Sequence, residues 1–266
     1  MKLNAVVIAD DVAENIGELC IMLKNSACQL FEQFGRTKDD VIVHSAVYCH
    51  DTVNRQNLSE KLALVNFKSF LCCWFGHGTD ESFCMNNENI VTPSDNHYIF
   101  SNALIYTFSC FNGGTLADVL VSNNAKAYVG YKGNANCPYG IDDVTCGIVM
   151  SFLSSFLGGK TIGNSVDDLK TSYEDAVFNE ELEPFQRSCF QENRDNITLK
   201  GQTGKEKPLS YTWEVNLKPY SHEEVFEYVG KELGKFNCRL IVENEDGKSF
   251  FPFVLYVNSE YEYGIT

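Results

Sequence analysis

Two apolar runs decide the fold of this chain: Phe67-Lys68-Ser69-Phe70-Leu71-Cys72-Cys73-Trp74-Phe75-Gly76-His77-Gly78 and Ala103-Leu104-Ile105-Tyr106-Thr107-Phe108-Ser109-Cys110. A continuous apolar run of this length, bounded by Gly or polar residues, predicts a strand that is covered on both faces. In open α/β sheets, ligands collect at the carboxyl ends of the strands. If the two strands are parallel neighbours, His77 and Cys110 lie side by side there as a base and a thiol.

Strand and helix patterns alternate over the first two thirds of the sequence. Strands are expected at 5–9, 41–48, 67–75, 103–108 and 127–131. Helices are expected at 16–35, 58–65, 114–120, 141–157 and 165–178, the last opened by a capping box of Ser165 and Asp168. A small hairpin around Asn86-Asn87 fits the polar stretch 82–92. The alternation predicts an α/β fold, a mainly parallel sheet of about five or six strands sandwiched by helices.

The pattern weakens after residue 178. Residues 1–178 are expected to form the core, and the polar segment 179–210 a mobile loop or linker, because it shows no clear periodicity. This segment carries Arg187, Arg194, Lys200, Lys205 and Lys207, and it is a candidate site of self-processing. Residues 211–266 then form a small α+β extension that packs on the core, with a helix at 225–233 and a hairpin turning at Asp246-Gly247.

Composition limits the partners and the compartment. The 266 residues carry a formal net charge of -15, which repels phosphate backbones and argues against direct nucleic-acid binding. The acidity either attracts basic polypeptides or serves solubility. No run is long and apolar enough to span a membrane, and no signal peptide is apparent at the start of the sequence. Eleven cysteines, an odd number and several of them in apolar patterns, predict free thiols in a reducing compartment, the cytoplasm.

The residue types at the two strand ends point to nucleophilic catalysis. A thiol becomes a good nucleophile when an imidazole lies within reach to take its proton. The backbone N–H groups of Gly78 and Cys110 are candidates to hold the oxyanion that forms on attack. Gly113-Gly114 precede a helix, whose N-terminus is expected to favour the Cys110 thiolate. The cysteine and histidine spacing predicts neither a metal site nor a cofactor.

These segments resemble the caspase-like fold of cysteine peptidases, which includes caspases, metacaspases, gingipains and CHAT-domain proteases. The resemblance rests on Trp74–Gly78, Thr107–Gly114, Ala125–Tyr131 and Leu157–Gly163, and it covers roughly residues 4–178. It implies that His77 is the base and Cys110 the nucleophile, with no third member. The interval of 33 residues between them (110 minus 77) is similar to that of the gingipain and CHAT branch.

The resemblance also suggests where substrate specificity is set. Caspases, which cut after Asp, place an Arg near the end of the first strand, whereas this chain has Asp10-Asp11 there, similar to metacaspases that prefer Arg or Lys. A second acidic pair, Asp142-Asp143, follows the fifth strand. Both pairs are candidates for the S1 pocket, although both also precede helices, where acidic residues serve as N-caps.

The function expected from the sequence is a cysteine endopeptidase that cleaves a protein or peptide substrate through a thioester, after Arg or Lys. A regulatory protein partner is left open. Two alternatives remain. A phospho-receiver domain also carries an acidic pair after strand one, but it needs an Asp where this chain has His77. A catalytically silent interaction module could use the same fold.

Overall fold

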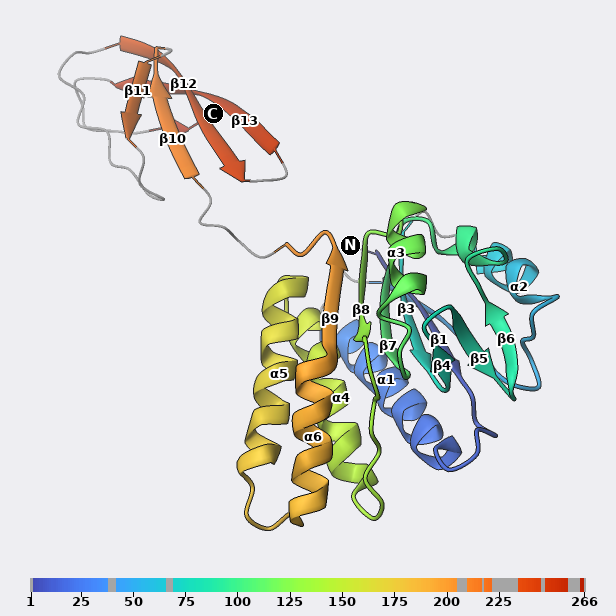
Figure 1. Cartoon of the computed structure of the whole chain (residues 1–266). Coiled ribbons are helices and arrows are strands. Elements are labelled where there is room, and N and C mark those ends of the chain that lie inside the picture. Colours follow the sequence, from blue (N-terminus) through green and yellow to red (C-terminus); the bar gives the residue numbers. More distant parts are fainter. Residues whose placement is uncertain are drawn as a thin grey trace. The chain divides into compact units, whose positions relative to one another are not determined.

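The computed structural model describes residues 2–37, 42–65, 69–204, 210–216, 218–221, 234–244, 247–257 and 264–265. The chain divides into two compact units, Met1–Gly204 and Lys205–Thr266, which are described separately (Figure 1).

The first unit is built on a six-stranded sheet in the order β2-β1-β3-β7-β8-β9. Its strands are β1 (Lys2–Ala9), β2 (Ile42–Cys49), β3 (Phe70–Phe75), β7 (Ala103–Phe108), β8 (Ala127–Tyr131) and β9 (Ile197–Gly201). The first five pair in parallel, and β9 joins the edge antiparallel to β8. The helices are α1 (Gly17–Thr37), α2 (Leu58–Val65), the 3-10 helix η1 (His97–Phe100), α3 (Thr115–Ser122), α4 (Asp142–Leu157), α5 (Ile162–Phe178) and α6 (Pro184–Asn196). The expected fold class is confirmed.

Both faces of the sheet are covered, which explains why its strands read as continuous apolar runs. On one face, Val7, Cys73 and Tyr106 belong to the cluster that includes buried residues of α1, α4, α5 and α6. On the other face, Val6 and Trp74 belong to the cluster that includes residues of α2, η1 and α3. Successive side chains of a strand point to opposite faces, so each strand contributes to both cores.

A three-stranded sheet lies between β3 and β7 in the sequence. It contains β4 (Gly78–Thr79), β5 (Ser82–Met85) and β6 (Glu88–Val91). Asn86 and Asn87, which connect β5 to β6, both have a positive φ, at 48° and 62°. Two such residues in succession are the mark of a type I′ hairpin turn, so the hairpin expected around Asn86-Asn87 is confirmed.

The segment expected to be a mobile loop or linker contains secondary structure, so that prediction was wrong for residues 184–201. Here α6 packs on the core and β9 completes the sheet. Phe190 is fully buried, and Leu182 and Ile197 are also in the core. The compact first unit accordingly extends to Gly204, beyond the core boundary expected at 178.

The capping box expected at Ser165 and Asp168 is also wrong. The N-cap of α5 lies four residues before Ser165, at Thr161, whose side chain accepts a hydrogen bond of 3.2 Å from the Asn164 N–H. Ser165 lies inside the helix, buried, and its hydroxyl donates to the Thr161 carbonyl oxygen. Thr and Ser satisfy the same capping rule, and the Gly-rich turn before Thr161 obscured which of them begins the helix.

In the second unit, the described elements are strands in the order β11-β10-β12-β13-β14. They are β10 (Ser210–Val215), β11 (Lys218–Ser221), β12 (Gly234–Asn244), β13 (Gly247–Val257) and β14 (Gly264–Ile265). The expected hairpin is confirmed, because β12 and β13 pair antiparallel from Gly234 opposite Val257 to Asn244 opposite Gly247. The helix expected at 225–233 lies outside the described residues.

Candidate active site

His77 and Cys110 follow neighbouring parallel strands at equivalent positions. Strands β3 and β7 pair in register up to Phe75 opposite Phe108. The ladder continues one step further, because the Gly76 N–H donates to the Phe108 carbonyl oxygen at 3.2 Å. His77 and Cys110 each come two residues after the last paired residue of their strand. The topology therefore brings the histidine and the thiol to the same point at the carboxyl edge of the sheet.

Gly78 allows the two strand ends to approach closely. A Cβ atom at this position would lie 2.3 Å from Ser109 Oγ, 2.5 Å from Asn112 Nδ2 and 2.8 Å from the Cys110 carbonyl oxygen. Real side chains do not tolerate such distances, so only glycine fits here. The second glycine of the Gly-His-Gly triplet is thus explained by contact with the segment that bears the cysteine.

Within the described residues, the two N–H groups expected to hold the oxyanion, those of Gly78 and Cys110, have no backbone acceptor. Gly78 pairs with Phe83 in the hairpin, and the Cys84 N–H donates to the His77 carbonyl oxygen at 3.0 Å. This arrangement is that of a non-hydrogen-bonded antiparallel pair, so Phe83 does not use the Gly78 N–H. Within the described residues, the Cys110 N–H also has no acceptor.

The backbone next to Cys110 adopts an unusual conformation. Phe111 has a φ of 62° and its side chain is 44% exposed. The Asn112 N–H donates back to the Cys110 carbonyl oxygen at 2.8 Å, and the Phe111 N–H donates to the Gly133 carbonyl oxygen. A left-handed non-glycine residue costs roughly 1–3 kcal/mol, and such residues cluster at functional sites. Two buried polar atoms, Ser109 Oγ and Asn112 Nδ2, have no hydrogen-bond partner in the described chain, and both lie next to Gly78.

The sulfur of Cys110 is held by a loop that the sequence did not associate with it. The Ala135 N–H lies 3.4 Å from Cys110 Sγ, and the thiol lies 4.0 Å from the Ala135 carbonyl oxygen. Burial raises the pKa of the Cys110 thiol above the ordinary value, and the charge of Glu192 raises it further, while the Ala135 N–H opposes the rise. The thiol form is therefore favoured in this state.

The expected help from the helix N-terminus is not found. Asp80 binds the start of α3, where its carboxylate accepts from the Thr115 N–H and its backbone carbonyl oxygen accepts from the Leu116 N–H. Hydrogen bonds from Thr115 lower the pKa of Asp80. Because Asp80 caps these groups, they are not directed at Cys110. The expectation was wrong because Asp80, two residues after Gly78 in the sequence, caps the start of α3.

The His77 ring makes no hydrogen bond to Cys110 within the described chain. Its Nε2 atom lies 3.3 Å from the Glu14 carbonyl oxygen, in the segment between β1 and α1. The side chain is partly exposed, so the ring can turn without disturbing the core. Apo geometries of catalytic pairs are often loose and tighten when substrate binds.

The first acidic pair has two different environments. Asp10 is fully buried beside Gly76, and its Oδ2 accepts from the Asn86 N–H at 3.0 Å while its Oδ1 has no partner in the described chain. Asp11 contacts His50, whose Nδ1 lies 2.6 Å from Asp11 Oδ1. Burial acts to raise the pKa of Asp11, but hydrogen bonds from His50 outweigh it and the net shift is downward. The same hydrogen bond raises the pKa of His50.

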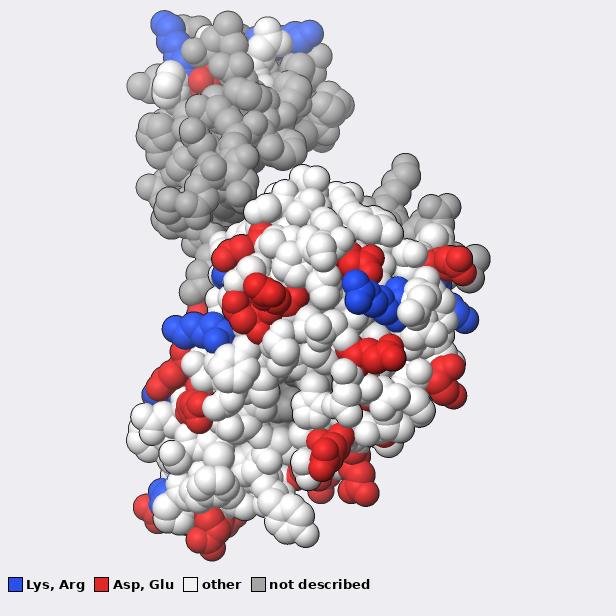
Figure 2. Space-filling view, turned by 45° about the vertical axis from the view of Figure 1, so that its right-hand side comes forward, with Lys and Arg blue, Asp and Glu red and all other residues white. Residues whose placement is uncertain are grey.

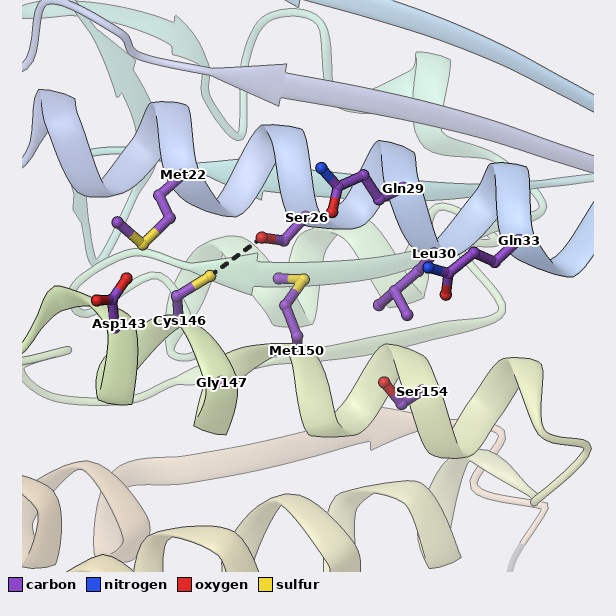
Figure 3. Close-up of a pocket in the computed structure, with 10 residues that line it drawn as sticks. All are labelled: Met22, Ser26, Gln29, Leu30, Gln33, Asp143, Cys146, Gly147, Met150 and Ser154. Carbon is purple, nitrogen blue, oxygen red and sulfur yellow. Dashed lines mark hydrogen bonds between the residues drawn. The ribbon is translucent and has the colours of Figure 1, made fainter.

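The second acidic pair lies at the start of α4. Asp142 accepts a weak hydrogen bond from the Cys137 thiol at 3.6 Å. Asp143 lines a groove of about 350 Å³ between α1 and α4 (Figure 3). In the same groove, the Cys146 thiol donates to Ser26 Oγ, with 3.4 Å between the sulfur and the oxygen. Burial raises the pKa of the Cys20 thiol, and the charges of Asp10, Cys137 and Asp11 raise it further. The described residues show no contact between the two acidic pairs, and Asp143 belongs to the groove.

A second cavity and the surface charge complete the surroundings. A polar cavity of about 480 Å³ adjoins β4, with Thr79, Ser82 and Thr115 in its lining. Figure 2 shows that acidic side chains are spread over the visible face of the molecule, with a few basic ones among them. Within the described ranges, no group of three or more His, Cys, Asp or Glu side chains is placed to hold a metal ion. No helix in those ranges carries an apolar stretch that would reach across a bilayer.

Comparisons with known proteins support the fold alone. No protein-family model and no curated protein matches this chain. Among solved structures, the chain is similar to one described as "Structure of Protease", with a TM-score of 0.51 and 10% sequence identity. The match covers 99% of this chain but only 66% of that chain. An identity this low shows a shared fold and leaves the activity to the residues of the site.

Proposed function

We propose that this chain is a cysteine endopeptidase in which Cys110 is the nucleophile and His77 the base. The observation that carries this proposal is the register of β3 and β7, because it puts the two residues at equivalent positions beyond adjacent strands. The description of the similar solved structure as a protease agrees with a peptidase of this fold.

In the proposed reaction, His77 takes the thiol proton and the Cys110 sulfur attacks the carbonyl carbon of the scissile peptide bond. The negative charge that develops on the carbonyl oxygen is bound by the N–H groups of Gly78 and Cys110. His77 returns its proton to the leaving amine, and a thioester remains on Cys110. Water then attacks the thioester with His77 as base, which releases the acid product and restores the thiol.

The substrate is proposed to be a polypeptide with Arg or Lys before the scissile bond. Asp10 is the best candidate for selecting the basic side chain, because one of its oxygens has no partner in the described chain. Asp11 is already engaged by His50, and Asp143 lies in the groove between the helices. A buried carboxylate that faces a long cationic side chain is a strong selectivity device.

The alternative is a catalytically silent interaction module. The observation in its favour is that His77 and Cys110 are not hydrogen-bonded to each other in the described chain, while the Cys110 sulfur contacts Ala135. A peptidase and a silent interaction module share the same fold, so only the reactivity of Cys110 distinguishes the two functions.

The test measures cleavage of fluorogenic peptides that end in Arg, Lys, Asp, Asn or Met, with labelling by a peptide-directed thiol probe. We expect cleavage after Arg and Lys, labelling at Cys110 among the eleven cysteines, and loss of both in Cys110→Ala. Asp10→Asn should reduce the preference for basic residues, and Asp143→Asn, the matched control, should not. If Cys110→Ala cleaved at the parent rate, the assignment of the nucleophile would be wrong. No cleavage of any peptide and no selective labelling would favour the silent module.

A further inference from the structure

The loop that contacts the Cys110 sulfur is itself held by α6. This loop, residues 132–137, follows β8 and lies beside the last turns of α6 (Figure 1). Its centre is Ala135, whose N–H points at Cys110 Sγ. The position of that N–H depends on what fixes the two flanking residues, Asn134 and Asn136.

Glu192 binds both flanking side chains with one carboxylate. Asn134 Nδ2 donates to Glu192 Oε1 and Asn136 Nδ2 donates to Glu192 Oε2, each at 2.9 Å. Each carboxylate oxygen thus holds one of the two asparagines that flank Ala135. Hydrogen bonds to an ionised carboxylate are among the stronger ones that side chains make.

Asn193, the next residue of α6, holds the backbone of the same loop. Its Oδ1 accepts from the Asn136 N–H at 2.6 Å, and its Nδ2 donates to the Asn136 carbonyl oxygen at 2.8 Å. Asn193 is fully buried, so these bonds are shielded from water. Asn196, one turn later, adds a weaker bond of 3.4 Å from its Nδ2 to the Asn134 carbonyl oxygen.

We propose that Glu192 and Asn193 are positioning residues that hold the Ala135 N–H against the sulfur of Cys110 and thereby set the reactivity of this thiol. Glu192 has two opposing effects on the thiol, one through its hydrogen bonds and one through its charge, and this makes the proposal testable. We call the hydrogen bonds from Glu192 and Asn193 to Asn134 and Asn136 the clamp. The clamp keeps the Ala135 N–H on the sulfur and so favours the thiolate, whereas the negative charge of Glu192 disfavours the thiolate. The ionisable group whose charge acts on the Cys110 thiol is Glu192 on α6, and His77 follows the neighbouring strand β3.

Three variants separate the clamp from the charge. Glu192→Gln removes the charge but keeps a side chain that can bond both asparagines, because amide groups can both donate and accept. Glu192→Ala removes the charge and the clamp together. Asp195→Asn, the matched control, removes one charge from the same helix at a side chain that pairs with Arg194.

The experiment measures alkylation of Cys110 by iodoacetamide from pH 5 to 10, with the site read by peptide mass spectrometry. We expect the midpoint of the Glu192→Gln profile to fall by about half a pH unit, roughly a threefold faster reaction below the midpoint. The midpoint of Glu192→Ala should lie above that of Glu192→Gln, since Ala135 is no longer held. Asp195→Asn should match the wild type.

Identical profiles for Glu192→Gln and Glu192→Ala would overturn the clamp, and an equal shift in Asp195→Asn would reduce the effect to bulk charge. The inference rests on the proposed function in that Cys110 is the thiol whose reactivity matters. Alkylation needs no substrate, so a protein that cleaves peptides with unchanged profiles refutes only the clamp. Shifted profiles without any cleavage refute only the peptidase.

Discussion

Replacing Gly78 by alanine should damage both the fold and the site. The added Cβ would lie 2.3 Å from Ser109 Oγ and 2.8 Å from the Cys110 carbonyl oxygen, and these atoms belong to a buried, packed segment. Overpacking of this kind costs about 1–3 kcal/mol of unfolding free energy. The same displacement moves the Gly78 N–H away from the proposed oxyanion position, and loss of one such donor lowers turnover roughly 10²–10³-fold.

Gly147→Ala is the matched control. Gly147 lies inside α4, and a Cβ atom there would meet nothing within 4 Å. Alanine in a helix interior is more stable than glycine by roughly 0.5–1 kcal/mol, so this variant should gain stability and keep its turnover.

Urea denaturation followed by circular dichroism gives the free energies, and hydrolysis of an Arg peptide gives the turnover. Circular dichroism of the variants without urea shows whether a variant that has lost turnover is still folded. If Gly78→Ala were as stable and as active as Gly147→Ala, the two strand ends would not touch as described, and the assignment of Gly78 to the oxyanion site would fail.

Three further outcomes are expected. Phe190→Ala should cost about 3–5 kcal/mol in urea denaturation, because Phe190 is fully buried, whereas Phe185→Ala on the same helix, 72% exposed, should change stability by less than about 0.5 kcal/mol. In an NMR titration, His50 should show a pKa above its ordinary value, and Asp11→Asn should lower it. The stability that the ion pair contributes through His50 is present below the ordinary pKa of histidine and is lost as the pH rises through the raised pKa of His50. On the acid side, the contribution of the ion pair is lost as the pH falls through the lowered pKa of Asp11. If the proposed peptidase processes itself, mass spectrometry should locate the cut at residues 205–207, where the second unit begins, and not within α6 or β9.

Most of the fold could be predicted from the sequence because its strands are buried on both faces. Runs such as Ala103–Phe108 contain no charged residue, and the observed β7 has the same bounds. The positions of His77 and Cys110 followed from the same runs, since a residue just beyond a buried strand lies at the edge of the sheet. Contacts made by later segments could not be predicted in this way. The bonds from Asp80 to Thr115, and from Asp11 to His50, join polar residues whose spacing along the chain follows no periodicity.

Helix α6 shows most clearly where pattern reading fails. Its buried side chains are Phe190 and Asn193, so it presents an aromatic ring and an amide to the core instead of an apolar stripe. A local signal did exist at its start, where Pro184 is the first helical residue and the Glu183 N–H donates to Gln186 Oε1 at 3.0 Å. A buried asparagine is tolerated because both ends of its amide are hydrogen-bonded to Asn136. Polar residues such as Glu192 and Asn193, which make the hydropathy pattern of this helix weak, are therefore the ones that bind the loop beside Cys110. The segment that resembled a linker fixes the surroundings of the proposed nucleophile.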